Sequence, residues 1–184
     1  MGTQFQKCEW YYSDNGFSSL EAMTQAHRAV VDAACAVLNG TGGSIIDLGC
    51  GNGVLVCRIA QRNGLKECYG VDLSARCIEH ARVISRQRHA RFLVGDLFSL
   101  PMSPLKTKHF RMALIMPGRM LEVEEQRALQ LRSWLRDHSD VILGYAYGDW
   151  IGRYGDLSGL AAATGFRALN MDQFEQAGVV QVIQ

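Results

Sequence analysis

Apolar positions recur along this chain with two periods, one typical of helices and one typical of strands. Residues 18–38 place apolar side chains three and four positions apart, which predicts an amphipathic helix that ends at the glycine-rich stretch 39–43. Short apolar runs predict five strands, at 44–48, 67–73, 90–94, 110–116 and 141–147. Helical patterns lie between these runs, at 54–62, 74–88 and 122–137. A last helix at 157–163 is followed by two further strands, at 166–171 and 179–183.

Alternating strands and helices predict an α/β fold, a doubly wound Rossmann-like sheet with helices on both faces. Seven strands are predicted. The sheet they form is expected to be mixed, because the connection between the last two strands is too short for a parallel crossover. The last strand is therefore expected to be antiparallel. We expect residues 1–40 to form an N-terminal helical segment that covers the active site, and residues 41–184 to form the binding core.

A glycine-rich stretch, SIIDLGCGNG at 44–53, directly follows the first predicted strand. Three glycines at every second position allow the main chain to approach a bound molecule closely. In an open parallel sheet, ligands lie beyond the carboxyl ends of the strands, so this loop, Asp72 and Asp96 share one rim. A carboxylate at the end of the second strand can accept hydrogen bonds from both hydroxyls of a ribose.

Two kinds of nucleotide ligand use such a rim. A dinucleotide site has the spacing G-x-G-x-x-G, but here the third glycine, Gly53, comes one residue early and Val54 takes its place. Asp47 also precedes the loop, where a carboxylate would face an anionic phosphate. A ligand with a cationic centre and no phosphate fits Asp47 better, and no catalytic domain for a nicotinamide-dependent oxidoreductase follows.

Three stretches together resemble the cofactor motifs of class I S-adenosylmethionine-dependent methyltransferases. They are IIDLGCGNG at 45–53, YGVDLS at 69–74 and VGDLF at 94–98, in the family's order and at strand ends. The resemblance covers nearly the whole chain, because a seven-stranded sheet with a terminal antiparallel hairpin is that family's fold. It implies S-adenosylmethionine as the cofactor.

The resemblance also implies roles for individual residues on the first two strand ends. The backbone of Gly49, Cys50 and Gly51 is expected to lie against the methionine portion of the cofactor. Asp47 is expected to hold the loop or to reach the amino group through water. Asp72 is expected to accept from the ribose hydroxyls.

The remaining implied contacts concern the adenine and the sulfonium. Leu73 is expected on one face of the adenine, Asp96 as acceptor for its amino group, and Leu97 as a backbone amide donor. Met116 is expected near the sulfonium. Tyr11 belongs to an aromatic N-terminal segment of the kind that family members often bring over the cofactor.

Candidates for the catalytic side are Tyr12, His27 and Arg119, and each has a structural alternative. Tyr12 and its neighbours could equally anchor a loose N-terminus by packing. His27 lies on the apolar side of its helix, where a buried histidine is the alternative to a base. Arg119 could clamp a carboxylate or phosphate with its planar guanidinium, or be a solvated surface residue.

The loop after the fourth strand reads MPGR at 116–119. It departs from the Asn/Asp-Pro-Pro-aromatic motif with which family members methylate amino groups of adenine or glutamine amides. Only the proline is shared, which argues against those substrates. On the fifth strand, Tyr145 and Tyr147 share one face, and packing under a helix is the interpretation for Tyr145.

Composition narrows the partners and the compartment. The 184 residues carry a formal charge of +1, which argues against a nucleic-acid or membrane surface as the partner. The six cysteines form no CxxC pair, so no metal site is expected. The chain shows no signal peptide and no membrane span, which favours a cytoplasmic protein.

The leading hypothesis is an enzyme that transfers a methyl group from S-adenosylmethionine to an N or O atom of a small-molecule metabolite, by in-line displacement. A methyltransferase acting on a protein or RNA is the second reading. A non-catalytic, methyltransferase-like binding module is the third. The rim has no inserted cap, so a second copy of the chain, in a homodimer, could also complete the site.

Overall fold

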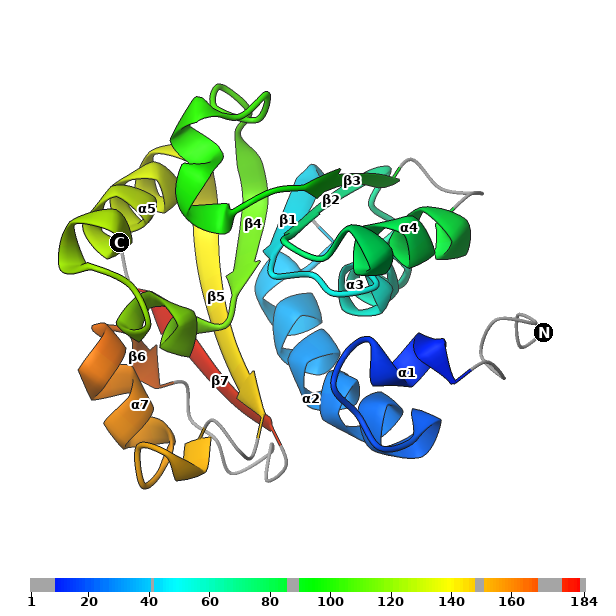
Figure 1. Cartoon of the computed structure of the whole chain (residues 1–184), viewed down its shortest axis with the longest axis horizontal. Helices are drawn as coiled ribbons and strands as arrows, with labels where there is room; N and C mark the ends of the chain where they lie inside the picture. Colours follow the sequence, from blue (N-terminus) through cyan, green and yellow to red (C-terminus); the bar gives the residue numbers. More distant parts are fainter. Residues whose placement is uncertain (1–8, 41, 86–89, 148–150, 169–176, 183–184) are drawn as a thin grey trace.

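The chain forms one seven-stranded sheet (Figure 1). Its strands are β1 (Ser44–Leu48), β2 (Glu67–Asp72), β3 (Ala90–Val94), β4 (Phe110–Ile115), β5 (Ser139–Tyr147), β6 (Arg167–Ala168) and β7 (Ala177–Val182). Their spatial order is β3-β2-β1-β4-β5-β7-β6. The first five are parallel to one another, whereas β7 runs antiparallel to both β5 and β6. The prediction of a Rossmann-like α/β fold built on a parallel sheet with helices is confirmed.

The helices connect these strands. They are α1 (Trp10–Ser13), α2 (Leu20–Leu38), α3 (Val54–Arg62), α4 (Ala75–Ile84), α5 (Glu125–His138) and α7 (Leu157–Thr164). Two 3₁₀ helices, η2 (Leu97–Met102) and η3 (Pro117–Leu121), follow β3 and β4. The computed structural model describes residues 9–40, 42–85, 90–147, 151–168 and 177–182, and the predicted helix and strand residues at 86–88, 169–171 and 183 lie outside these ranges.

Local side-chain chemistry fixes where the helices near the rim begin and end. The Ser19 hydroxyl accepts from the amide of Ala22 at 3.1 Å and so caps α2, which ends at Asn39 in a left-handed conformation. The Ser74 hydroxyl caps α4 in the same way, accepting from the amide of Cys77 at 3.2 Å. Ser74 lies two residues after Asp72, the last residue of β2, so the cap also fixes the turn that follows Asp72.

Two hydrophobic clusters cover the two faces of the sheet. Helices α2, α3 and α4 pack on one face, and η2, η3, α5 and α7 pack on the other (Figure 1). Neighbouring residues of a strand point to opposite faces, so Ile45 belongs to the first cluster and Ile46 to the second. The sheet is thus buried on both sides, as a parallel sheet must be.

Helix α2 belongs to the core and is not a separate cover. Val30, Ala34 and Leu38 are buried in the same cluster as Ile45 of β1 and Met112 of β4. The expected boundary between residues 40 and 41 therefore does not separate two cores. The segment before α2, residues 9–17, which we call the N-terminal segment, lies against the rim, and His27 of α2 also reaches it.

The strand order reverses between β1 and β4, which are neighbours although two strands separate them in sequence. Crossovers leave β1 and β4 in opposite directions, and a crevice opens at the carboxyl ends of these strands. No helix within the described ranges combines the length and the apolar character that crossing a bilayer requires.

Candidate functional site

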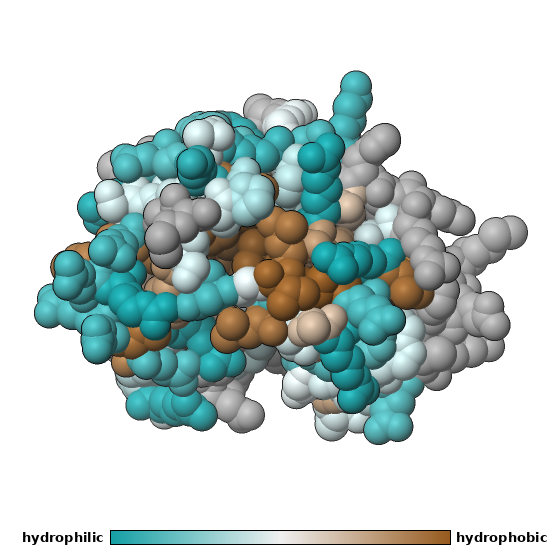
Figure 2. Space-filling model, turned by 45° about the horizontal axis from the view of Figure 1, so that its top comes forward, coloured by the Kyte–Doolittle hydropathy of each residue, from teal (hydrophilic) through white to brown (hydrophobic). Residues whose placement is uncertain are grey.

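Two cavities meet at this reversal of strand order. The first cavity, of about 540 Å³, lies among the loops that follow β1, β2, β3 and β4 and the start of α5. The second cavity, of about 260 Å³, lies between the glycine loop, the N-terminal segment and the end of β5. Four residues line both cavities and so mark where the two cavities join: Gly49, Asp72, Met116 and Arg119. Figure 2 shows hydrophobic atoms gathered in the middle of one face, between hydrophilic borders.

Most of the predicted cofactor residues line these cavities. Asp72, Leu73, Asp96, Leu97 and Met116 line the first. The second is lined by Asp47 and by the loop residues Gly49, Cys50 and Gly51. The sequence therefore placed the residues of three separate strand ends correctly on one rim.

Asp72 joins the loops that follow β1 and β2. Its Oδ2 accepts from the amide of Gly51 at 2.8 Å, and its Oδ1 accepts from the amide of Ser74 at 2.8 Å. Each carboxylate oxygen has a further lone pair, so both can still accept from a ligand. Asp72 thus fixes the rim and remains available to a diol in the cavity.

Asp96 has a cationic partner that the sequence did not indicate. Its Oδ1 accepts from the amide of Phe98 at 3.0 Å, and its Oδ2 lies 2.5 Å from Nη2 of Arg127, which begins α5. The Arg127 guanidinium also lies over the Phe98 ring, 5.3 Å from its centroid. Arg127 lies 31 residues from Asp96 in the chain, and no local pattern marks it as part of the rim.

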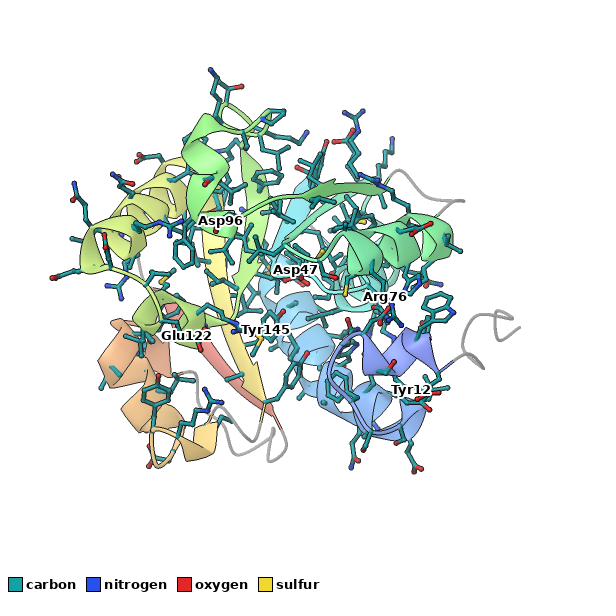
Figure 3. The ribbon with its side chains drawn as sticks, viewed as in Figure 1. Tyr12, Asp47, Arg76, Asp96, Glu122 and Tyr145 are labelled. Carbon is teal, nitrogen blue, oxygen red and sulfur yellow. The ribbon has the colours of Figure 1, made fainter. Side chains whose placement is uncertain are left out.

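Asp47 is completely buried and only partly satisfied (Figure 3). Its Oδ1 accepts from the Tyr145 hydroxyl at 3.2 Å, and its Oδ2 has no hydrogen-bond partner within the described part of the chain. Burial raises the pKa of Asp47 to about 7; the hydrogen bond from Tyr145 opposes the rise and the charge of Asp72 adds to it. Tyr145 packs beneath a helix, as expected, and in addition orients this carboxyl group.

His27 lines the second cavity within an aromatic group. Its ring stacks on Tyr147 at 6.2 Å between centroids and meets the edge of Phe17 at 5.5 Å. Burial, together with the positive charge of Arg58, lowers the pKa of His27 to about 3. Such an imidazole is neutral near pH 7 and a weak base, so its surroundings favour the structural alternative over a catalytic one.

Arg119 lies at the junction of the two cavities. Its Nη1 pairs with Oε2 of Glu122 at 2.9 Å, and about half of the Arg119 side chain is exposed. Because η3 is anchored by the buried Pro117 and Met120, the backbone that carries Arg119 is held in place. The arginine is therefore positioned at the rim with an exchangeable, solvent-exposed partner.

The structure places Tyr11 and Tyr12 outside both cavities. Tyr11 is buried against Met23 and Val54, and Tyr12 packs partly buried beside this cluster. Figure 3 shows Tyr12 on α1, at the edge of the molecule. The single turn of α1 directs these rings toward α2 and α3, and their expected roles at the cofactor and the acceptor stay predictions.

The turn after α1 lines the second cavity instead. Residues 14–17 contribute there, with Phe17 as the aromatic member. This turn is not among the site candidates that the sequence indicates, and no local pattern indicates that Asn15 contacts Asn52, 37 residues away. Across the described ranges, no three His, Cys, Asp or Glu side chains come close enough to hold a metal ion.

The family model of the methyltransferase domain matches residues 39–143, more than half of the chain and all of the loops that line the first cavity. The chain belongs to this family, the S-adenosylmethionine-dependent methyltransferases of class I. S-Adenosylmethionine is accordingly the cofactor that this methyltransferase fold binds.

One curated relative matches over a short stretch. The release factor glutamine methyltransferase of Rhodospirillum rubrum is 39% identical over 74 residues, which cover 38% of this methyltransferase. The match spans only 22% of the length of the relative. This methyltransferase thus spans about a fifth of the relative's length, and the match shows likeness over that stretch alone.

Solved structures show the same fold at low identity. The magnesium protoporphyrin IX methyltransferase of Synechocystis, with bound S-adenosylmethionine, aligns with a TM-score of 0.60 and 17% identity, over 95% of this methyltransferase and 84% of that chain. The N-methyltransferase NodS of Bradyrhizobium japonicum aligns with a TM-score of 0.58 and 12% identity, over 84% and 93%. The plantazolicin methyltransferase BpumL aligns with a TM-score of 0.56 and 20% identity, over 85% and 59%.

Proposed function

We propose that this methyltransferase transfers the methyl group of S-adenosylmethionine to an N or O atom of a small-molecule metabolite. The observation that carries the proposal is the pair of joined cavities, which share Gly49, Asp72, Met116 and Arg119. A nucleoside fits the larger cavity, and the smaller one holds the amino-acid end and admits an acceptor. The sulfonium belongs at the junction, beside Met116.

Two features of the chain fit the cofactor. Asp47 Oδ2 is a buried oxygen without a partner in the described residues, and because Asp47 lines the second cavity, an ammonium group bound there would satisfy this oxygen. Gly49 has φ +84° and lines both cavities, so any side chain at this position would occupy the space of the ligand. Both features match a ligand with a cationic amino group and no phosphate.

Within this proposal, each rim residue has one task toward the cofactor. Asp72 accepts from the ribose hydroxyls, and Leu73 and Leu97 cover the adenine. Asp96 accepts from the adenine amino group while Arg127 holds its other oxygen. The backbone of Gly49–Gly51 lies along the methionine portion, and residues 14–17 cover that end of the site.

The bound cofactor supplies an activated methyl group and a neutral thioether as the leaving group. The chain's contribution is to align the acceptor in line with the carbon–sulfur bond, because charge is dispersed in this displacement and needs little stabilisation. Among the described groups of the second cavity, His27 is neutral, and burial raises the pKa of both Tyr145 and Tyr147 above that of free tyrosine. His27 and these two tyrosines therefore do not supply a base to the acceptor near pH 7.

Residues 116–119 support a small-molecule acceptor over a protein amide. In the structure, this stretch begins η3, with Pro117 and Gly118 buried and only Arg119 half exposed at the junction. The motif that family members use for glutamine amides is absent there. An arginine at the junction suits an acceptor that carries an anionic group away from its reacting atom.

Calorimetric titration of the purified chain with S-adenosylmethionine, S-adenosylhomocysteine and NAD tests the cofactor. We expect micromolar binding of the two sulfur ligands and none of NAD. Labelled S-adenosylmethionine is then supplied with the small-molecule, protein and RNA fractions of a cell extract. We expect the label to appear in the small-molecule fraction. Label confined to the protein or RNA fraction would contradict the proposed small-molecule acceptor.

A further inference from the structure

Hydrogen bonds join the N-terminal segment to the glycine loop that follows β1. Asn15 Oδ1 accepts from the amide of Asn52 at 3.0 Å. The fully buried Asn52 side chain returns to the segment, because its Nδ2 donates to the carbonyl of Tyr11 at 2.5 Å. Its Oδ1 accepts from the amide of Val54 at 3.2 Å and so starts α3. The loop is thus held from the segment on one side and from α3 on the other.

Asn15 also explains why residue 51 must be glycine. Gly51 has φ +54°, and a Cβ at this position would overlap Asn15 Oδ1 and lie 3.3 Å from Asn15 Cγ. The amide of Gly51 donates to Asp72 Oδ2 at 2.8 Å. The Asn15 amide group therefore lies directly on the loop backbone that carries one of the cofactor-facing contacts.

The other side of the segment is anchored to α4. The Asp14 carboxylate, which is 7% exposed, pairs with Arg76 at 3.4 Å and with the ring of His80. The Trp10 ring lies on His80, with 4.2 Å between centroids. Since the glycine loop follows β1 and α4 follows β2, the segment links the two loops that flank the second cavity.

We propose that Asn15 is a positioning residue for the amino-acid end of the cofactor. The inference rests on the proposed function, because it assigns that end to the second cavity, which residues 14–17 and 49–51 line together. The Asn15 side chain accepts a hydrogen bond from the amide of Asn52, and it occupies the space that a side chain at position 51 would need. The loop backbone thereby keeps the shape against which the amino-acid end binds, while the first cavity, to which Asn15 does not contribute, keeps its affinity for the nucleoside.

Two probes that differ only at the amino-acid end test this assignment. S-Adenosylhomocysteine carries that end, and 5′-deoxy-5′-methylthioadenosine lacks it. Calorimetry on Asn15→Ala is expected to show an affinity for S-adenosylhomocysteine that is lower by about tenfold, the size of one lost hydrogen bond, and an unchanged affinity for methylthioadenosine. Asn15→Asp keeps an acceptor oxygen for the Asn52 amide and is expected to recover part of the loss.

Asn63→Ala is the matched control. Asn63 is also partly buried and caps α3 through the carbonyl of Ile59 at 2.9 Å, but it lines neither cavity. We expect it to leave both affinities unchanged. Equal losses for both probes in Asn15→Ala, or no loss for S-adenosylhomocysteine, would overturn the proposal. A parent chain that binds neither probe would instead refute the proposed function.

A second pair of variants tests the contact itself. Gly51→Ala creates an overlap with Asn15, and shortening Asn15 to alanine removes that overlap. We expect Gly51→Ala to reduce the affinity for S-adenosylhomocysteine by a larger factor in the parent than in an Asn15→Ala background. Equal factors in both backgrounds would show that Asn15 does not lie on the loop when the ligand binds.

Discussion

The hydroxyl of Tyr145 donates to Oδ1 of Asp47 at 3.2 Å, and both side chains are buried in the middle of the sheet, on β5 and β1. The two residues lie 98 positions apart in the chain. Within the described residues this carboxyl group makes no other side-chain hydrogen bond, since Oδ2 has no partner there. The protonation state of Asp47 therefore depends on the Tyr145 hydroxyl, on burial and on any ligand that contacts Oδ2.

Replacing Tyr145 with phenylalanine removes that bond and leaves Asp47 without a donor. We expect Tyr145→Phe to raise the pKa of Asp47 further above its usual range and to destabilise the fold by roughly 1–3 kcal/mol near pH 8, where Asp47 is ionised. Urea unfolding of both proteins at pH 8 measures this difference. The control is Tyr147→Phe, because Tyr147 lies on the same face of the strand and does not donate to Asp47. An equal loss of unfolding free energy in both variants would assign the effect to packing.

The raised pKa of Asp47 gives stability a definite dependence on pH. In the unfolded chain the carboxyl group loses its proton near 3.8, whereas in the folded chain it keeps the proton up to about 7. Between these values the folded state binds more protons, so its stability falls as pH rises through this window and levels off above it. The total loss from this one group is on the order of 4 kcal/mol.

Asp47→Asn isolates this effect because the amide does not titrate. The difference in unfolding free energy between Asp47→Asn and the parent is expected to grow in favour of the variant from pH 5.5 to pH 8. Parallel urea unfolding at several pH values measures it, and other titrating groups cancel in the difference. A difference that stays constant over this range would mean that Asp47 is already ionised.

Cofactor affinity is expected to change with pH in the opposite direction. An ammonium group at Asp47 Oδ2 prefers the ionised carboxylate, so the affinity for S-adenosylhomocysteine should rise between pH 6 and pH 8, by up to about tenfold per pH unit below the pKa. Methylthioadenosine has no ammonium group and should show no such rise. Calorimetry over this range decides the matter, and a pH-dependent affinity that persists in Asp47→Asn would refer the effect to another group.

Asp72 should matter equally to both probes, because the ribose is common to them. Asp72→Ala removes the acceptor for the diol and releases the amide of Gly51, so we expect the affinity for each probe to fall by roughly 1–3 kcal/mol. Asp32→Ala, which breaks an exposed ion pair with Arg62 remote from the cavities, provides the comparison. Unchanged affinity in Asp72→Ala would remove this carboxylate from the ribose site.

The sequence was most informative where a function depends on position along one strand. Asp47, Asp72 and Asp96 each lie at or beside the end of a strand, and parallel strands must bring these ends together. Gly49 and Gly51 were equally readable, since a backbone with positive φ requires glycine. These features follow from local pattern and topology alone.

The sequence was least informative where a role depends on tertiary contacts. Arg127 meets Asp96 only because α5 packs against η2, and Asn15 meets Asn52 only because α1 folds back over the loop. The placement of Tyr11 and Tyr12 away from the two cavities could not be predicted for the same reason, since the direction of their rings is set by α2 and α3. For His27, the helical pattern predicted apolar surroundings, but the nearby Arg58 appears only in the fold.

The bond between Asn15 and the amide of Asn52 has a consequence for how motion at this site can be observed. This amide proton is covered by a side chain of the N-terminal segment. Its exchange with deuterium therefore requires the segment to leave the loop, while the amides of β1 exchange only when the sheet itself opens. The ratio of the two exchange rates would measure how much more often the N-terminal segment leaves the glycine loop than the sheet opens.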